Sequence, residues 1–379
     1  MDTINLPLFE PSLEHSFSGV VKSLRFCKAL KFKEITLSSI SKVLYAIQGC
    51  TGTSHWTTLR AIPSAGATYP LKIYVSLYSR DTGSGFYEYK SSRGKLVFIK
   101  PGKEKQTKMF IHAIFSRTTR YYGSRGERYV LMEVGHALQN SLLESSVLNI
   151  DMSYELNIEE INRELKEGGK PLAVIELGEC IEKPAFEHRN RKYEGISIGL
   201  RHVKLPELSL EKAILKRRSV RKYSSRKLSL EELTYVIYYS FGRLWNDHRP
   251  YAPPLNVYYL NMFLVAGEVD GLDSGIYFYN DEKNELVLLK KGDFRKKLYD
   301  AALRQEWILK APVNILLAGG GVDKQYLDVE TGMIGQNIYL AATSIGLGTV
   351  AIGAFYDEEV ADVIGVDEQP LYIMPIGRL

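Results

Sequence analysis

The feature that most constrains the fold is an internal repeat that covers about half the chain. Residues 37–49 match residues 230–242, and each stretch spaces its apolar side chains along one face of a helix and ends at a glycine. The most specific match is a series of tyrosine, glutamate, glycine, glutamine and asparagine that begins at Tyr129 and recurs with the same spacing from Tyr326. These residues predict a long helix in each half of the chain.

Strand patterns repeat in the same order. Residues 69–75 alternate apolar side chains with others and match residues 253–259, and a tyrosine-rich hairpin follows each of them. Residues 171–178 match residues 370–377 near the ends of the two halves. Chance does not explain several matches in one order, so we expect two copies of one structural unit.

The repeat predicts the organisation of the whole chain. We expect one α+β unit over residues 1–185 and a second over residues 209–379, with a polar linker at residues 186–208. Two similar units with apolar faces would most simply pack on each other as a pseudo-two-fold dimer within one chain.

Composition limits the classes of function. Apolar residues make up 45% and charged residues 25% of the 379, as in globular proteins, and a net charge of +5 is weak evidence for nucleic-acid binding. No apolar stretch is long enough to cross a membrane, and residues 1–10 do not form a signal peptide. Cys27, Cys50 and Cys180 have no paired spacing, so we expect no disulfide framework and a cytoplasmic location.

Short motifs for other chemistries lack the right context. Gly346-x-Gly348 fits a dinucleotide fingerprint, but it follows a predicted helix and enters a predicted strand, which is the reverse of the required order. Residues 195–199 fit a nucleophile elbow without a convincing strand before them. No histidine has a partner at zinc-ligand spacing, so we assign no metal.

A basic run stands before the second copy of the repeated helix. It contains Arg217, Arg218, Ser219 and Arg221. Guanidinium groups offer a planar fork for phosphate, and serine adds a hydroxyl donor. Taken alone, the run fits a solvated surface at least as well, so a phosphate site needs a second line of evidence.

That evidence is a family resemblance. The basic run, Gln305 within residues 302–312, residues 351–355 and the ending Pro-Ile-Gly-Arg378 together resemble the nitroreductase superfamily. Residues 60–70 closely resemble a segment of its SagB-type branch, and the resemblance covers most of the chain. It implies two nitroreductase-like units that embrace each other, with FMN bound at their interface.

The resemblance also implies a set of cofactor-binding residues. They are Arg217, Arg218, Ser219, Arg221, Gln305, Ile352, Gly353, Ala354 and Arg378 from the second half, and Pro63, Ser64, Ala65 and Gly66 from the first. The arginines and the serine would hold the phosphate and the polar edge of the flavin, and the glutamine would bond its pyrimidine edge. The small residues of the first half would cover the ring, which needs close backbone approach.

A second, symmetry-related site lacks its residues. The first half has no arginine run before its helix, and it carries Glu179 where the second half carries Arg378. The second half carries residues 251–254, Tyr-Ala-Pro-Pro, where the small-residue segment should stand. We therefore expect one FMN site per chain and one vestigial site.

These expectations define the candidate functions. The leading one is an FMN-dependent oxidoreductase that exchanges a hydride at flavin N5 with a small-molecule or peptide substrate. Two interpretations stay open within it: a SagB-type dehydrogenase of thiazoline or oxazoline rings, and an NAD(P)H-dependent reductase of nitro compounds or quinones. A flavin-free scaffold in a peptide-modifying complex is a third. No catalytic residue can be named, because the Lys-Tyr pair associated with the azoline enzymes occurs only at Lys192-Tyr193 and Lys222-Tyr223.

Overall fold

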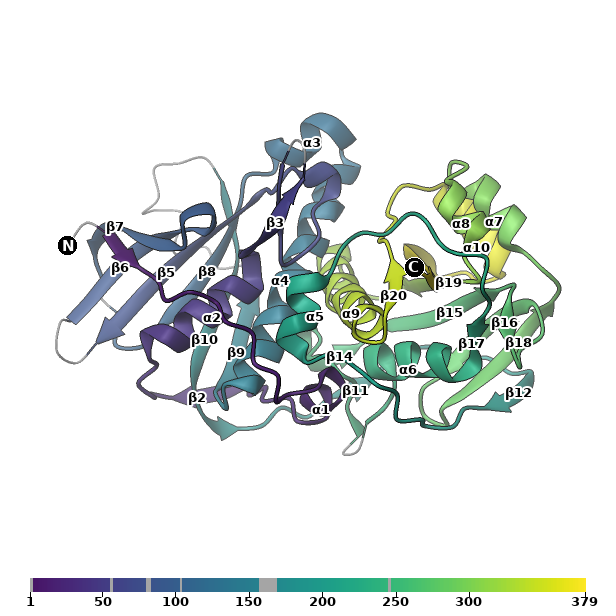
Figure 1. The fold of residues 1–379 in the computed structure, drawn as a ribbon, viewed down its shortest axis with the longest axis horizontal. Coiled ribbons are helices and arrows are strands. Elements are labelled where there is room, and N and C mark those ends of the chain that lie inside the picture. Colours follow the sequence, from purple (N-terminus) through teal and green to yellow (C-terminus); the bar gives the residue numbers. More distant parts are fainter. Residues whose placement is uncertain (1–2, 55–56, 80–82, 103, 157–168, 245–246) are drawn as a thin grey trace. The chain divides into compact units, whose positions relative to one another are not determined.

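The computed structural model describes residues 3–54, 57–79, 83–102, 104–156, 169–244 and 247–379 (Figure 1). It divides into two compact units, one formed by Met1–His15 with Ser23–Ala185 and the other by Ser16–Lys22 with Phe186–Leu379. We call them unit 1 and unit 2. Figure 1 shows unit 1 mainly in purple and blue, and unit 2 mainly in green and yellow.

Unit 1 is built on one antiparallel sheet. Its strands are β1 (Thr3–Asn5), β2 (Ala29–Lys31), β5 (Leu71–Ser79), β6 (Gly83–Lys90), β7 (Lys95–Pro101), β8 (Lys108–Ala113), β9 (Asp151–Leu156) and β10 (Lys170–Glu182). They lie in the order β1-β7-β6-β5-β8-β10-β2, and β9 also pairs with β10. A separate hairpin joins β3 (Cys50–Ser54) to β4 (Thr57–Arg60).

Unit 2 repeats seven of these eight strands in the same order. Its strands are β12 (Ile196–Gly199), β15 (Leu260–Ala266), β17 (Gly275–Asn280), β18 (Glu285–Lys291), β19 (Val313–Gly319), β20 (Leu347–Thr349) and β21 (Gln369–Arg378). Their order, β12-β18-β17-β15-β19-β21-β20, is that of β1-β7-β6-β5-β8-β10-β9 in unit 1. The predicted duplication of one α+β unit is confirmed.

The repeated helices also match. Helices α2 (Leu37–Gln48) and α6 (Leu230–Phe241) both have 12 residues, and α4 (Arg125–Val147) and α9 (Lys324–Ser344) are the two long helices that the sequence predicts. Ser229 caps α6 in a reciprocal capping box with Glu232, because each side chain bonds the other residue's backbone amide. Asn140 ties α4 to α2 through a 2.7 Å hydrogen bond to the Ala46 carbonyl.

The sheet of unit 2 is buried on both faces. Alternate residues such as Phe263 and Val265 pack into a core with α7 (Arg295–Ala301), α8 (Glu306–Lys310) and α10 (Asp357–Ile364). Figure 1 shows these three short helices grouped together. Helices α6 and α9 pack against each other, and α9 contacts β15, β20 and β21. The helical layers hold the segments around residues 217, 305 and 351 that the resemblance singles out.

Helix α1 (Phe17–Lys22) belongs to unit 2, although unit 1 follows it in the chain. Ser16 bridges Ser209 just before α5 (Leu210–Lys216), and the Ser18 amide donates a 2.9 Å hydrogen bond to the Glu207 carboxylate. Residues 186–208, expected to be a linker, carry β11 (Glu187–His188) and β12, which pair with β14 (Val257–Tyr258) and β18. Their polar composition reflects exposed edge strands, because an edge strand keeps one side in water.

Two further expectations need correction. The absence of a disulfide is wrong, because Cys27 and Cys180 form one, with their Cα atoms 5.7 Å apart. Sequence spacing could not show it, since the sheet brings together residues that are 153 positions apart. The cysteine pattern therefore gives no argument for a reducing compartment. The strand expected at residues 253–259 begins later, because Leu255 and Asn256 adopt positive φ angles of 60° and 56° after two prolines.

No described helix is both long and apolar enough to cross a membrane. Among the described residues, no three histidine, cysteine, aspartate or glutamate side chains gather as a metal site would require.

Candidate functional site

The basic run of unit 2 lies where α5 ends. The helix stops at Arg217, which is buried, and the residues after it extend toward β20. Ser219 forms a parallel bridge with Thr349, and the Val220 amide donates a 2.8 Å hydrogen bond to the Thr349 carbonyl. Pairing with a strand therefore fixes the backbone of the run, which a freely solvated basic segment would not need.

Tyr339 of α9 joins this run to a distant segment. Its hydroxyl lies 3.0 Å from Ser219 Oγ and accepts a 2.8 Å hydrogen bond from the Ala351 amide. The Arg217 guanidinium lies 5.2 Å from the centre of the Tyr339 ring, within the range of a cation–π contact. The tyrosine is almost fully buried. No motif in the sequence points to Tyr339, because one tyrosine among 25 gives no signal of its own.

Arg221 and Gln305 meet the same region through α8. The Arg221 guanidinium lies 5.5 Å from the centre of the Trp307 ring. Gln305 precedes that helix, and its side-chain amide donates hydrogen bonds of 3.0 and 2.9 Å to the carbonyls of Ala302 and Ala354. The structure thus brings Gln305 to the Ile352–Ala354 segment, as the resemblance implies.

Several polar groups in this cluster have no protein partner. Thr349 Oγ1 and Trp307 Nε1 are buried and make no hydrogen bond with any residue that the structure describes. Among the residues that the structure describes, none forms an ion pair with Arg221 and none donates a hydrogen bond to Gln305 Oε1. These groups are two buried hydrogen-bond donors, one cation and one acceptor. They would suit a ligand that has an anionic group at one end and both donors and acceptors along another edge. FMN is such a ligand.

Arg378 is held differently from its expected role. Its guanidinium forms a 2.8 Å ion pair with Glu232, and its Nε donates a 3.0 Å hydrogen bond to the Lys227 carbonyl. Glu232 is also the residue that completes the capping box of α6. In this arrangement the charge of Arg378 is already balanced, and its backbone carbonyl anchors the Ser224 amide.

The Lys-Tyr pairs do not present an unbound phenol to the cluster. The Tyr193 hydroxyl donates to Glu368, and Lys192 pairs with Glu282 at 2.7 Å. Tyr223 donates a 3.0 Å hydrogen bond to the Val220 carbonyl, and burial raises its pKa. The hydroxyl groups of both tyrosines therefore form hydrogen bonds within unit 2.

The small-residue segment of unit 1 forms a tight loop. The one-turn helix η1 (Ala65–Ala67) contains Gly66 with a φ of 57°, and Ala67 and Tyr69 also have positive φ angles. Ser64 Oγ accepts a 3.0 Å hydrogen bond from the Tyr69 amide, and Ser64 also bonds the carboxyl of Glu133. Pro63, Ser64 and Ala65 are partly exposed, and Gly66 is exposed.

Glu133 is the buried anchor of that loop. Burial raises its pKa to about 8, against the opposing effects of the Ser64 hydrogen bond and the Arg60 charge. The carboxyl is therefore mostly protonated at neutral pH, and it can donate as well as accept a hydrogen bond.

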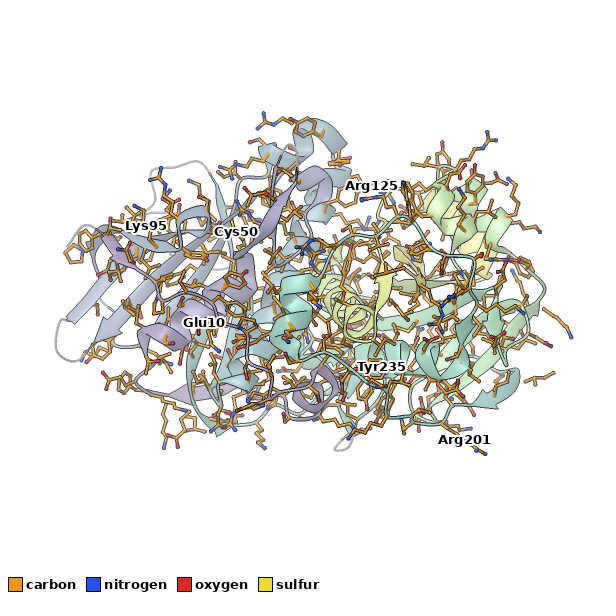
Figure 2. The ribbon with its side chains drawn as sticks, viewed as in Figure 1. Glu10, Cys50, Lys95, Arg125, Arg201 and Tyr235 are labelled. Atoms are coloured by element: carbon orange, nitrogen blue, oxygen red, sulfur yellow. A yellow bond between two sulfur atoms is a disulfide. The ribbon has the colours of Figure 1, made fainter. Side chains whose placement is uncertain are left out.

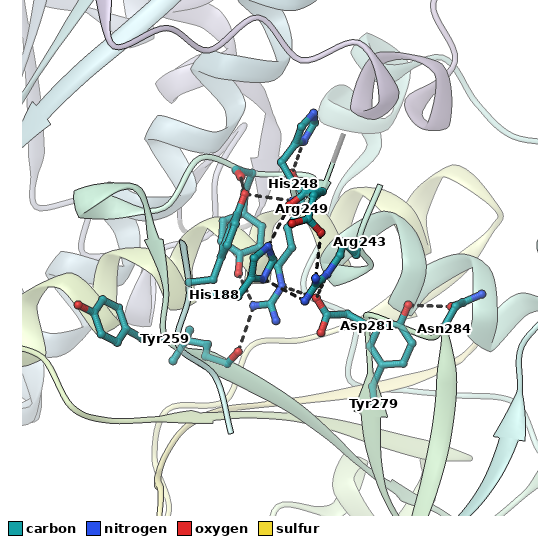
Figure 3. Close-up of polar contacts among 12 residues, drawn as sticks. His188, Arg243, His248, Arg249, Tyr259, Tyr279, Asp281 and Asn284 are labelled. Carbon is teal, nitrogen blue, oxygen red and sulfur yellow. Dashed lines mark hydrogen bonds and ion pairs between the residues drawn. The ribbon is translucent and has the colours of Figure 1, made fainter. Parts of the chain in front are cut away.

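The corresponding glutamate in unit 2, Glu330, joins a buried network through Tyr251, and Figure 3 shows Arg249 and Asp281 of this network. Arg249 is fully buried, pairs with Asp281 at 3.0 Å and donates to the Tyr251 hydroxyl and the Leu260 carbonyl at 3.2 and 3.1 Å. Tyr251 in turn donates a 3.0 Å hydrogen bond to Glu330, whose pKa burial raises to about 7. This network fixes residues 251–254, where the sequence lacks the small-residue segment.

In unit 1, the segment that corresponds to the arginine run forms ion pairs and a disulfide with other residues of the same unit. Phe26 bridges Met152 in parallel, as Ser219 bridges Thr349 in unit 2. Arg25 forms a 2.9 Å ion pair with Asp151, Lys31 pairs with Glu179 at 2.8 Å, and the Cys27–Cys180 disulfide adjoins these pairs in the chain. These cations are thus paired with carboxylates of unit 1 itself.

Comparison with known proteins places this architecture in a family. A model described as the nitroreductase family matches residues 214–378, which contain the cluster around Tyr339. A protein of Methanocaldococcus jannaschii that carries the nitroreductase name is 36% identical over 186 residues, which are 46% of this chain and 93% of that protein. The chain belongs to the nitroreductase family. It is therefore a nitroreductase-family oxidoreductase, as predicted.

Two other similarities concern a solved structure and a second curated relative. The solved structure of a nitroreductase-named protein from Anabaena variabilis has a TM-score of 0.79 at 22% identity, and covers 96% of this chain and 100% of its own. The nitroreductase fold thus extends beyond the residues that the family model matches. The trifolitoxin operon protein TfxC of Rhizobium leguminosarum bv. trifolii is 23% identical over 193 residues, 43% of this chain, and the chain spans 54% of the length of TfxC.

Proposed function

We propose that this nitroreductase-family chain is an FMN-dependent oxidoreductase with one flavin site. The observation that carries the proposal is the cluster in which Tyr339 joins Arg217 and Ser219 to the Ala351 amide, beside unpartnered polar groups. Bound FMN would supply hydride exchange at N5 of its ring.

The contacts of each residue suggest its role. The Tyr339 oxygen accepts from the Ala351 amide, so its own proton can go to Ser219, and the serine proton is then available to a phosphate oxygen. Arg221 lies at the exposed end of the run and supplies charge. Gln305 uses both amide hydrogens on Ala302 and Ala354, so its Oε1 would accept a hydrogen bond from the pyrimidine edge.

The first unit would complete the site. We propose that Pro63, Ser64, Ala65 and Gly66 cover the flavin ring, in the intrachain pseudo-dimer that the family resemblance implies. Support comes from the exposure of these small residues and from the anchoring of the loop to Glu133. Ile352, Gly353 and Ala354 would line the ring from unit 2.

Two substrate classes are candidates within this function. The similarity of residues 60–70 to the SagB-type branch favours a dehydrogenase of azoline rings in a peptide. The 36% identity to a nitroreductase-named protein favours an NAD(P)H-dependent reductase of nitro compounds or quinones. Anaerobic mixing with NADH or NADPH separates them, because rapid bleaching of the flavin band supports the reductase and its absence supports the dehydrogenase.

Flavin binding tests the site. We expect the purified protein to release about one FMN per chain, and Arg221→Gln to weaken FMN binding about tenfold to hundredfold, since a hydrogen bond to a charged group contributes about 1.5–3 kcal/mol. Arg226→Gln is the matched control, because Arg226 is an exposed arginine in the same segment. Equal affinities of the two variants would contradict the site. A protein that takes up no FMN would favour the flavin-free scaffold.

A further inference from the structure

Unit 1 contains a cavity beside the loop that we propose covers the flavin ring. Its volume is about 620 Å³, within the range of small-molecule sites. The residues that line it are Gly66, Ala67, Thr68, Arg117, Arg120, Tyr121 and Tyr122. One wall is thus the loop around η1, and the other is α3 (Ser116–Tyr122), a helix that has no counterpart between β19 and α9 of unit 2.

The two walls are fixed to each other. Thr68 Oγ1 lies 2.8 Å from Thr118 Oγ1, and Arg117 Nη1 donates a 3.0 Å hydrogen bond to the Tyr69 carbonyl. A Cβ added at Gly66 would lie 2.6 Å from the Tyr122 hydroxyl, and the φ of 57° already favours glycine. The cavity is therefore a preformed feature of unit 1.

Its electrostatic character is positive. Two of the lining side chains are guanidinium groups, and none of them is a carboxylate. Residues 116–129 contain four arginines and one glutamate. The first of the remaining arginines, Arg125 (Figure 2), opens the long helix α4, whose N-terminus adds positive potential. An anion would be attracted to this place from solution.

Aromatic surface stands beside the charge. The Tyr121 side chain is 70% exposed and that of Tyr122 is 37% exposed, although both are large rings. The Arg120 guanidinium lies 5.7 Å from the centre of the Tyr121 ring. Exposed aromatic rings next to cations suit a flat ligand that carries a negative group. The ring of the ligand can stack on a tyrosine, and its negative group can pair with an arginine.

We propose that this cavity binds a flat ligand bearing an oxyanion, either a carboxylate or a phosphate. Arg117 and Arg120 would pair with the oxyanion, and Tyr121 and Tyr122 would pack against the ring. Binding requires unit 1 alone. The ligand's role as substrate rests on the proposed function, in which the adjoining residues Pro63–Gly66 cover the flavin.

Three probes that share a nitrophenyl ring test the proposal by calorimetry without a reductant. They are 4-nitrobenzoate, 4-nitrophenyl phosphate and neutral 4-nitrobenzamide. We expect at least one anion to bind ten times more tightly than the amide, and to bind more weakly as ionic strength rises. The tighter anion identifies the oxyanion as carboxylate or phosphate.

Variants locate the binding. Arg120→Gln should weaken binding of the preferred anion about tenfold and leave binding of the amide unchanged. The substitution should leave the two walls in place, because the Arg120 Nε donates its hydrogen bond to the Ser116 carbonyl within the same helix. Tyr121→Ala should weaken the binding of all three probes, because each of them carries the ring that would pack against Tyr121. Arg93→Gln, at an exposed arginine of η2 (Ser91–Arg93), is the control. Equal binding of the three probes, or equal effects of Arg120→Gln and Arg93→Gln, would overturn the proposal. FMN content is counted in the same samples, so loss of flavin and loss of anion binding are distinguished.

Discussion

The Tyr339 hydroxyl holds together two segments that are far apart in the chain. It lies 3.0 Å from Ser219 Oγ and accepts a hydrogen bond from the Ala351 amide. Each such bond contributes about 1 kcal/mol. We therefore expect Tyr339→Phe to weaken FMN binding about fivefold to thirtyfold, as measured by titrating the apoprotein and following flavin fluorescence.

A second buried tyrosine provides the control for that measurement. Tyr279 is also fully buried, and its hydroxyl donates a 2.8 Å hydrogen bond to Asn284, away from the arginine run. Tyr279→Phe removes the same atom and a similar bond, so it reports any general loss of stability. An equal loss of FMN affinity in both variants would show that Tyr339 has no particular role.

The Glu133 carboxyl makes stability depend on pH. Its ordinary pKa of 4.5 is raised to about 8 by burial, so the folded protein keeps a proton that the unfolded chain releases. The free energy of unfolding therefore falls as pH rises from about 4.5 to 8, by at most about 1.4 kcal/mol per pH unit for this proton. We expect Glu133→Gln to remove that part of the decline in urea unfolding at pH 5, 7 and 9. Parallel pH profiles of variant and wild type would exclude this origin.

Sequence patterns predicted the residues of the site unevenly. Arg217, Ser219 and Gln305 were singled out because their family spacing is visible in the chain, and the structure brings the first two together through Tyr339. Trp307 and Tyr339 were missed, because their importance comes from tertiary contacts that no local pattern encodes.

Among the elements, the disulfide that joins Cys27, just before β2, to Cys180 of β10 has a testable consequence. Cys27 and Cys180 close a loop across 153 residues, and a native disulfide commonly contributes about 2–4 kcal/mol by restricting the unfolded chain. We expect dithiothreitol to lower the free energy of unfolding of unit 1 by about that amount, and the Cys27→Ala/Cys180→Ala double variant to lose the response.

Cys50 supplies the control for the disulfide. It is a free cysteine in β3, so Cys50→Ala should retain the response to dithiothreitol. Peptide mapping of the unreduced protein should recover Cys27 joined to Cys180. Alkylation of both cysteines in that sample would contradict the link.

Helical and strand periodicity predicted the repeated elements well. Helices α2, α4, α6 and α9 and the long strands β10 and β21 appear where the two halves match. Helices α3, α7 and α8 were not expected, since each occurs in one unit only and the repeat cannot reveal it. These unshared helices carry the lining of the cavity in unit 1 and Trp307 in unit 2.

For the whole molecule, the asymmetry of the two units predicts the flavin count. Between β7 and β8, the described residues of unit 1 form no helices that correspond to α7 and α8 and offer no counterpart of Gln305, and the potential phosphate site of this unit contains the Arg25–Asp151 ion pair. We expect released FMN to reach about one per chain at saturation, counted against protein concentration. Two per chain would show that unit 1 retains a working site.

The place of α1 has a consequence for how the chain is made. Residues 16–22 leave the ribosome early, yet the Glu207 carboxylate that Ser18 bonds is synthesised 189 residues later. The buried side chains of Phe17 and Val21 must therefore stay uncovered while the sheet of unit 1 is completed. A gene split at the boundary between the units would separate α1 from the unit to which it belongs, so a fragment starting at residue 186 would lack one of its own helices.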